Sequence, residues 1–443
     1  MTDTTALPPP IQRDGEPRAD ATRAALHGLV PRGHKTYTPT QLVVSRACGC
    51  YLESADGARL LDFSSGVLVA NLGHGHPDFE RRYAELVDGV PRNCYNAVSP
   101  LETQAAERLL ASLGRPQFQR VMWADSGSAA IIKAIWAAQH ARPNKRVIIA
   151  TRAGFHGKKG LAGDVTGEKS SNPNVRFISF PTTEVDDVSM LPAAEGAEAD
   201  LAVPYIAELA GLLAEHGSDI LALVTEPYLG AAGSFHPPKW YLRLLSDWCA
   251  KNNVVFILDE VQSCHGRTGE MYAYERYGIE PDIVALGKGL GNGAPIAALA
   301  GPAELLDSMG YGEASDTYSG NPHGCAAVTA ALDVYESQPV VENCRDMSRR
   351  MQDGLSSLRQ EFACVENVRG EGLVWGVEMA AADGKSADDV ANDAVLACYH
   401  EGVHLLGPLA RKVLRVSPPL IITTDQLDAG IQGMRHALHS LSG

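Results

Sequence analysis

The chain has 443 residues, 45% of them hydrophobic, and a net charge of −15. This length is too great for one small core, so we expect two domains, or one large domain with a smaller one appended. The acidic charge argues against nucleic acid as a partner, because it repels phosphate backbones. It could favour a cationic substrate, although a solvated acidic surface is the more common reason for such a charge.

Residues 1–35 are polar and rich in proline, and we expect them to form a flexible arm. They lack the apolar core of a signal peptide. No stretch approaches about 18 consecutive apolar residues, so neither a transmembrane helix nor a membrane partner is expected. The nine cysteines are scattered and include no CxxC pair, which argues against a metal site or a disulfide framework and favours a reduced, cytoplasmic protein.

The region from Val43 to Phe63 has two apolar runs around the turn signal Asp56-Gly57 and predicts a hairpin. After it, short apolar runs alternate with helical stretches such as Ala129–His140 and Trp240–Lys251. Continuous valine, isoleucine and leucine runs are typical of strands buried on both faces, and the alternation predicts a mainly parallel sheet with helices on both sides. The seven predicted strands are Arg120–Trp123, Arg146–Ala150, Arg176–Phe180, Ile220–Thr225, Val254–Asp259, Asp282–Leu286 and Ala297–Ala300.

The pattern changes at about Ala330, where a long helical stretch leads into a short α+β segment. We therefore expect a large ligand-binding domain over residues 71–330. A smaller domain is expected to combine residues 36–70 with residues 331–443. The α+β segment comprises Cys364–Met379, Ala387–Gly402, Leu414–Val416 and Thr424–Ser440.

Three chemically suggestive features follow predicted strands, where open parallel sheets bind ligands. They are Asp259 at the end of VFILDEVQ, Lys288 in DIVALGKGLGNG, and the turn Ser126-Gly127-Ser128, which opens a helix. Alone, Lys288 could simply reach solvent, and Asp259 could simply cap a turn. Together they match the needs of pyridoxal 5′-phosphate (PLP): a nucleophilic lysine, a carboxylate for the pyridine nitrogen, and a helix N-terminus for the phosphate.

Several motifs in fixed order resemble the class III (ω-type) aminotransferases of PLP fold type I, over nearly the whole chain from about residue 40. The resemblance implies a mainly parallel seven-stranded sheet with helices on both faces and a smaller α+β domain. The matching segments are LDFSSGVLVANLGHGHPDF, DSGSAA, GFHGKKG, TEPYLGAAG, the block from LDEVQ to GAPIAAL, TYSGNPHGCAA and LRVSPPL.

The resemblance implies roles for single residues. Lys288 would form a Schiff base with PLP and shuttle a proton, and Asp259 would hold the pyridine nitrogen. The other implied cofactor-binding residues are Ser126, Gly127 and Ser128 for the phosphate, Phe155 and His156 at the ring, Gln262 at the phenolic oxygen, and Glu226 in support of this network.

Two further implications concern the partner subunit and the substrate. Thr317 would reach the phosphate of a neighbouring subunit, which implies a homodimer with shared active sites. Arg415 would bind the substrate carboxylate through two parallel hydrogen bonds, and Ser65 is a second candidate for substrate binding.

The sequence departs from the family pattern at three places. Relatives that use ornithine or γ-aminobutyrate carry a glutamate where this chain has Ala231, which argues against those substrates. Ala129 stands where the family has a glutamate in its SGxEA motif. His265 stands in the family's GFGRTG motif, as a residue either of the pocket or of a helix end.

We therefore expect amino-group transfer in a ping-pong cycle, with glutamate or alanine as the donor. The acceptor is a carbonyl compound, and an oxidised amino sugar is one candidate. Elimination or dehydration, aminomutase, racemase and decarboxylase chemistry would use the same lysine and aspartate and stay open as alternatives. A cofactor-free binding protein on this scaffold would be expected to have lost those residues.

Overall fold

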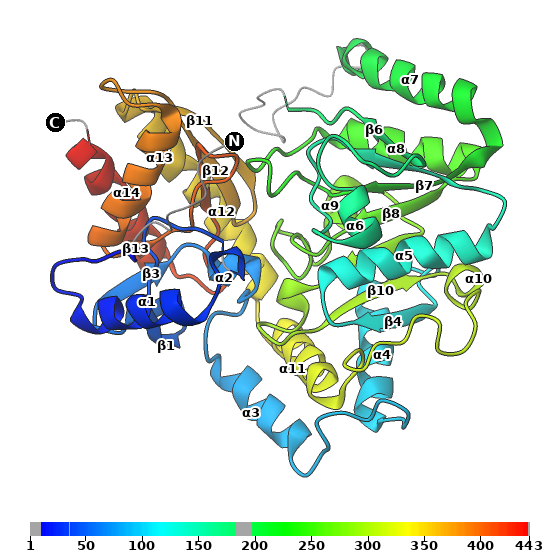
Figure 1. Cartoon of the computed structure of the whole chain (residues 1–443), viewed down its shortest axis with the longest axis horizontal. Coiled ribbons are helices and arrows are strands. Elements are labelled where there is room, and N and C mark those ends of the chain that lie inside the picture. The colour runs from blue at the N-terminus through cyan, green and yellow to red at the C-terminus, as the bar shows by residue number, and fades with distance from the viewer. Residues whose placement is uncertain (1–9, 35, 183–196, 442–443) are drawn as a thin grey trace.

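A seven-stranded sheet forms the centre of the larger lobe in the computed structural model, which describes residues 10–34, 36–182 and 197–441. Its spatial order is β4 (Arg120–Ala124), β10 (Ala297–Gly301), β9 (Ile283–Leu286), β8 (Val255–Asp259), β7 (Ile220–Thr225), β5 (Val147–Thr151) and β6 (Val175–Ile178). Only β10 runs antiparallel to its neighbours in this sheet. The mainly parallel fold predicted from the sequence is confirmed (Figure 1).

The central strands are apolar throughout because both faces of the sheet are covered. Along β5, Val147 and Ile149 face one core, and Ile148 and Ala150 face the other. Helices α4 (Pro100–Leu113), α8 (Lys239–Asn252) and α11 (Pro322–Ser337) contribute to the first core, and α5 (Gly127–Ala141) contributes to the second. The other helices of this lobe are α3 (Pro77–Val87), α6 (Gly160–Asp164), α7 (Ala197–His216), α9 (Ala273–Tyr277) and α10 (Ala303–Leu306).

The smaller lobe is built on two sheets (Figure 1). One has the order β11 (Val365–Glu371), β12 (Val374–Met379) and β14 (Val413–Val416), all antiparallel. The other has the order β1 (Val44–Cys48), β2 (Tyr51–Ser54), β3 (Arg59–Asp62) and β13 (Val403–His404). Helices α12 (Val340–Glu361), α13 (Ala387–His400) and α14 (Thr424–Leu441) pack against these sheets.

The predicted hairpin between Val43 and Phe63 is present, with Asp56-Gly57 as the turn between β2 and β3. The region holds one more strand than predicted, because Gly49 takes a left-handed conformation (φ +56°) and turns β1 back along β2. Conversely, the short α2 (Ser65–Leu68) is not an ordinary helix. All four of its residues have positive φ, a conformation that costs non-glycine residues about 1–2 kcal/mol each.

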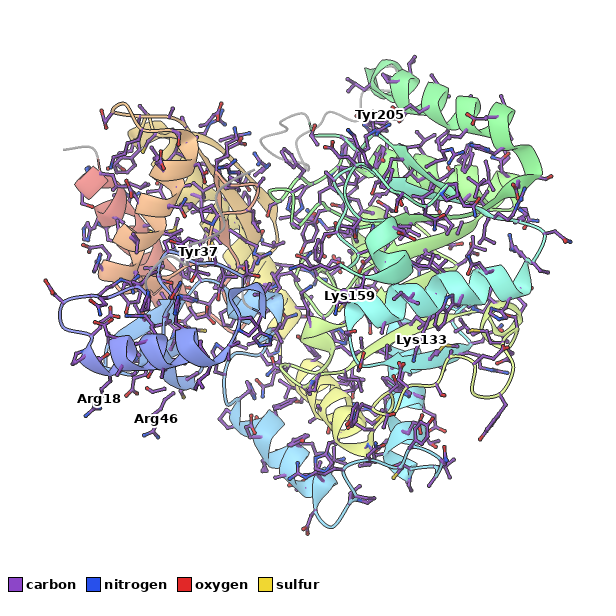
Figure 2. All side chains as sticks on the ribbon, in the orientation of Figure 1. Arg18, Tyr37, Arg46, Lys133, Lys159 and Tyr205 are labelled. Carbon is purple, nitrogen blue, oxygen red and sulfur yellow. The ribbon has the colours of Figure 1, made fainter. Side chains whose placement is uncertain are left out.

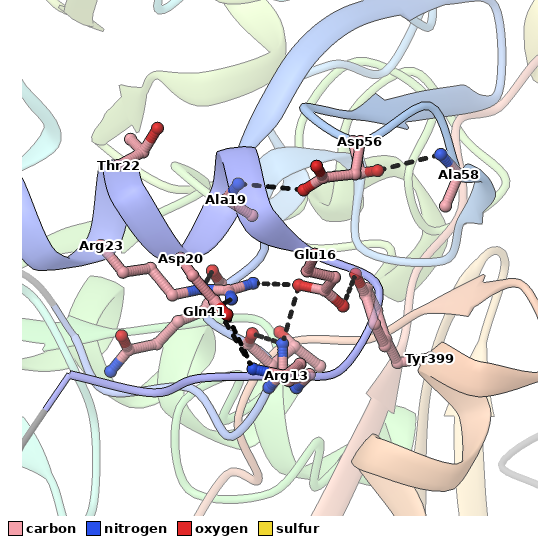
Figure 3. A network of polar contacts seen from close by, with 12 residues as sticks. Arg13, Glu16, Ala19, Asp20, Thr22, Arg23, Gln41, Asp56, Ala58 and Tyr399 are labelled. Carbon is pink, nitrogen blue, oxygen red and sulfur yellow. Dashed lines mark hydrogen bonds and ion pairs between the residues drawn. The ribbon is translucent and has the colours of Figure 1, made fainter.

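The prediction of a flexible arm over residues 1–35 is wrong for α1 (Pro17–Leu29), whereas residues 1–9 and 35 lie outside the described residues. Arg23 is buried and pairs with Glu16 and Asp20 (Figure 3). The carboxylate of Asp56, from the hairpin turn, accepts from the backbone N–H groups of Arg18 and Ala19, each at 2.9 Å. Charges that suggest a solvated arm in the sequence therefore satisfy one another and fix this helix to the smaller lobe.

Among the described residues, no helix is both long and apolar enough to cross a membrane.

Candidate active site

A cavity of about 340 Å³ lies at the carboxyl ends of the sheet strands. Its wall contains eight of the residues that the sequence singles out: Ser126, Gly127, Ser128, Phe155, His156, Asp259, Gln262 and Lys288. They come from four separate segments, and the parallel strands bring them together at one edge of the sheet. The remaining lining residues are Val69, Asp125, Val261, Gly293, Ala294, Pro295 and Ile296.

Lys288 follows β9 in a left-handed conformation, with a φ of +45°. Its neighbour Gly289 is required there, because an added Cβ would lie 2.3 Å from Nδ2 of Asn71. Burial lowers the pKa of Lys288, and Arg415 lowers it further, although the charge of Asp259 opposes both effects. A larger share of neutral amine makes Lys288 a better nucleophile and proton acceptor than an exposed lysine.

Asp259 ends β8 and is only 4% exposed. One carboxylate oxygen accepts from Nδ1 of His156 at 2.7 Å, and the other accepts from the backbone N–H of Val261 at 3.0 Å. Although burial opposes the charged imidazole, the hydrogen bond and charge of Asp259 raise the pKa of His156. The two hydrogen bonds fix the Asp259 carboxyl group at the cavity wall, where the pyridine nitrogen of PLP requires such a partner.

The Ser126–Ser128 turn opens α5, a helix of 15 residues, so its free N–H groups and positive dipole end favour an anion. Ser126 caps the helix by accepting from the N–H of Ala129 at 3.3 Å. At Gly127 an added Cβ would lie 2.8 Å from a methyl group of Val261, so only glycine fits between the turn and β8. Phe155 is 37% exposed, and its side chain lies on the cavity wall, available to an aromatic ring.

Glu226 lies behind the wall rather than on it. Its carboxyl group accepts from the N–H of Phe155 at 2.9 Å and from Nε2 of Gln262 at 3.2 Å. Burial raises the pKa of Glu226 to about 7; the charge of His156 lowers it, and that of Asp259 raises it. A protonated Glu226 can donate to the amide oxygen of Gln262, which is buried without a partner. That hydrogen bond requires the amide to be turned so that its oxygen, rather than its nitrogen, faces Glu226. Gln262 also lines the cavity, where its side chain is available to a phenolic oxygen, so these residues fit PLP.

Besides Glu226, three predicted residues do not line the cavity. Arg415, in β14, is 6% exposed, and its Nε has no hydrogen-bond partner. Thr317 is exposed, in a segment before α11. The substrate-binding prediction for Ser65 is not supported by the geometry, because its fully buried hydroxyl donates to the carbonyl of Ser417 at 2.7 Å and accepts from Arg267 at 3.2 Å.

His265 is neither a pocket residue nor a helix-end residue. It is fully buried against Tyr272 and Tyr335, with ring centroids 5.5 and 5.6 Å away. Burial lowers the pKa of His265 to about 3, so the ring is neutral and acts as a core aromatic.

Arg267 is a structural residue of the site that the sequence reasoning missed. This fully buried guanidinium donates to the carbonyls of Leu373 and Pro418, and to the side chains of Ser65 and Asn71. Asn71 in turn lies against Gly289, beside Lys288. Arg267 thereby links the smaller lobe to the lysine turn, and its place in the CHGRTG motif was the available signal.

The part of the chain that the structure describes contains no metal-binding group of three or more histidine, cysteine, aspartate or glutamate side chains.

The chain is similar to known proteins over most of its length. The model of the aminotransferase class-III family matches residues 33–438. An acetylornithine aminotransferase of Agrobacterium fabrum is 31% identical over 420 residues, which cover 92% of this chain and 96% of that protein. A 4-aminobutyrate aminotransferase of Mycobacterium leprae is 30% identical over 421 residues, which cover 92% of each.

A solved structure has a similar fold. The PLP-bound form of an amine transaminase from an uncultivated Pseudomonas species matches with a TM-score of 0.81 and 25% identity, over 94% of this chain and 97% of that one. The likeness therefore includes both lobes and every strand that contributes to the cavity.

Proposed function

The chain belongs to the class-III aminotransferase family and is a PLP-dependent enzyme, and from this premise we propose that it transfers an amino group from glutamate or alanine to a carbonyl compound, with Lys288 as the residue that carries the cofactor. The observation that supports this most strongly is the shared cavity of Lys288, Asp259 and the Ser126–Ser128 turn. PLP, when bound, supplies the electron sink for the reaction.

The residues of the chain have separable tasks in this proposal. Nζ of Lys288 accepts the proton from the donor's Cα and returns a proton in the second half of the cycle, because burial increases its neutral fraction. Asp259 is the partner of the pyridine nitrogen, and the hydrogen bond from His156 orients its carboxyl group. The Ser126–Ser128 turn binds the phosphate, and Phe155 covers one ring face.

Arg415 is proposed to bind the donor's carboxylate. Its guanidinium is buried, and no ion pair to it occurs among the described residues; burial lowers its pKa to about 10, so it remains charged at neutral pH. An unpaired buried cation favours an anionic ligand, because the ligand removes the cost of leaving the charge unneutralised. Arg415 does not line the cavity, but it is close enough to Lys288 to lower the pKa of that amine.

The acceptor is proposed to be a carbonyl compound of specialised metabolism, with an oxidised amino sugar as the candidate to test. Two observations favour it over the substrates in the relatives' names: Ala231 replaces the glutamate that the family resemblance associates with ornithine and γ-aminobutyrate, and the chain carries a net charge of −15, which suits a cationic substrate.

We further propose a cytoplasmic homodimer with two shared active sites. Exposed apolar side chains gather near Thr317: Tyr318 and Tyr311 in its own segment, and Tyr95 and Val98 in the segment whose Asn93 donates to the Thr317 carbonyl at 2.8 Å. Such a patch suits a second copy of the chain.

The nine cysteines, which form no disulfide in the described residues, suit a reducing compartment.

The test is a two-stage turnover experiment with purified holoenzyme. In the first stage L-glutamate, L-alanine, acetylornithine and 4-aminobutyrate are compared as donors by the release of their carbonyl products. In the second stage a 6′-oxo-aminoglycoside and simple aldehydes and ketones are compared as acceptors. We expect glutamate or alanine to react and the oxo-aminoglycoside to be aminated. Reaction of only simple carbonyl compounds would exclude the amino sugar, and ammonia or carbon dioxide release without an acceptor would indicate elimination or decarboxylation instead.

A further inference from the structure

Thr317 lies in a segment that has no helix or strand of its own between α10 and α11. Thr317 is exposed. The segment is nevertheless anchored on both sides of Thr317 by the side chains of Asp316 and Ser319, and Asn93 donates to the backbone carbonyl of Thr317. An exposed residue on a fixed backbone is suited to contact a partner without a large ordering cost.

The anchor of this segment is Lys133, which is 3% exposed and comes from the middle of α5 (Figure 2). Its ammonium group contacts Oδ2 of Asp316 at 2.7 Å, Oγ of Ser319 at 3.2 Å and the carbonyl of Trp123 at 2.7 Å. These three acceptors match the three donors of an ammonium group. Ser319 also donates to Asp316 at 2.7 Å, which closes the cluster.

Fold stability alone does not account for a charged group at this position. The neighbouring buried positions of α5 are alanine and isoleucine, and an apolar side chain would complete that face. Replacement of a buried ion pair by apolar residues is often neutral or stabilising, because it removes the cost of desolvating the charges. Although burial opposes ionisation, the hydrogen bond from Lys133 lowers the pKa of Asp316, so the pair is charged and holds one geometry.

We propose that Lys133 is a positioning residue, which fixes the Asp316–Ser319 turn so that Thr317 reaches the cofactor phosphate in the partner subunit's active site. This inference rests on the proposed homodimer with shared sites. Lys133 lies on the same helix whose N-terminus forms the phosphate turn of its own subunit, so α5 would serve both sites. Loss of the Lys133 contact should therefore weaken cofactor binding, and it should do so by displacing Thr317.

The experiment measures PLP affinity by titrating the apo-dimers of Thr317→Ala, Lys133→Met and the double variant. Each single change is expected to weaken PLP binding by about tenfold, the usual loss for one hydrogen bond to a charged group. The double variant is expected to bind no more weakly than Thr317→Ala, because residues that act through one contact are not additive. If Lys133→Met does not fold, Asp316→Asn tests the same contact from the half-exposed side.

Asp307→Asn is the matched control, since Asp307 begins the same segment but pairs with Arg120 at the surface. Its PLP affinity should stay within about twofold of the unmodified protein. An unchanged affinity in Thr317→Ala would contradict the shared site itself. A loss in Thr317→Ala, with Lys133→Met either unchanged or fully additive to it, would overturn the role of Lys133 alone.

Discussion

At the scale of single residues, the cavity depends on groups whose charge is set by burial. Lys288 and Glu226 are both shifted toward their neutral forms, whereas Asp259 keeps a hydrogen-bonded imidazole beside it. The neutral carboxyl group of Glu226 has a structural consequence. A neutral carboxyl group can donate as well as accept, so Glu226 can bind either end of the Gln262 amide.

Glu226 should make the apo-protein less stable as pH rises. Its folded-state pKa of about 7 lies above the usual value of 4.5, so its contribution is fully present below about pH 4.5 and is lost as pH rises through 7. Glu226→Gln should therefore gain stability relative to the unmodified apo-protein between pH 5 and 8, by up to about 3 kcal/mol. Denaturant unfolding at several pH values measures this difference. The exposed Glu107→Gln should show no such trend, and a flat difference for Glu226→Gln would contradict the raised pKa.

At the scale of elements, the strands could be predicted and several of the connections could not. A run such as Leu221–Val224 has one stable location, between two apolar layers, so its sequence is sufficient. The helix α1 is different, since its stabilising contacts come from Asp56 and from Tyr399, whose hydroxyl lies 2.8 Å from Glu16. The sequence around α1 contains no pattern that predicts contacts with residues as distant as Asp56 and Tyr399.

The same limit applied to the candidate site. Lys288, Asp259 and the Ser126–Ser128 turn were predictable because strand ends meet at one edge of the sheet. The burial of the Ser65 hydroxyl could not be predicted, because the left-handed conformation that buries it has only Gly66 as a local signal. Arg267 was missed because its acceptors are neutral, and mostly carbonyl oxygens, which leave no mark on a sequence.

Arg267 should be essential to the junction between the smaller lobe and the lysine turn. Arg267→Met leaves four buried acceptors without their donor, so we expect a loss of at least about 3 kcal/mol in the free energy of unfolding. Arg120→Met removes an exposed ion pair and should cost less than about 1 kcal/mol. Chemical denaturation measures both, and equal effects would refute the bridging role of Arg267.

At the scale of the whole molecule, buried charges connect the two lobes. Glu371 ends β11 in the smaller lobe and binds Arg276 and the hydroxyl of Tyr277 in the larger one. His236 approaches the same carboxylate at 3.1 Å. Although burial opposes ionisation, the charges of Arg276 and His236 lower the pKa of Glu371 to about 2. The cavity lies in the larger lobe, but Arg415 belongs to the smaller one, so this contact helps to set their separation.

Glu371 should stabilise the junction of the lobes at neutral pH and lose this effect in acid. A depressed pKa gives stability that is present above about pH 4.5 and declines as pH falls toward 2. Glu371→Gln should lower the melting temperature at pH 7, and the difference from the unmodified protein should shrink below pH 4.5. Thermal melts from about pH 2 to about pH 8 follow this difference across the window that the pKa sets. A difference that grows on acidification would contradict the proposed charge state.

The central claim is that Lys288 carries the cofactor, and borohydride reduction of the holoenzyme tests it most directly. Reduction makes the lysine–cofactor bond permanent, so peptide mass mapping locates the added mass. We expect the added mass on Lys288. Before reduction, the holoenzyme should absorb at about 410–430 nm, and the amino donor should shift this band to about 330 nm. Lys288→Ala should show neither the added mass nor the band. The exposed Lys251→Ala should behave like the unmodified protein. Added mass on another lysine, or none after reduction, would contradict the account.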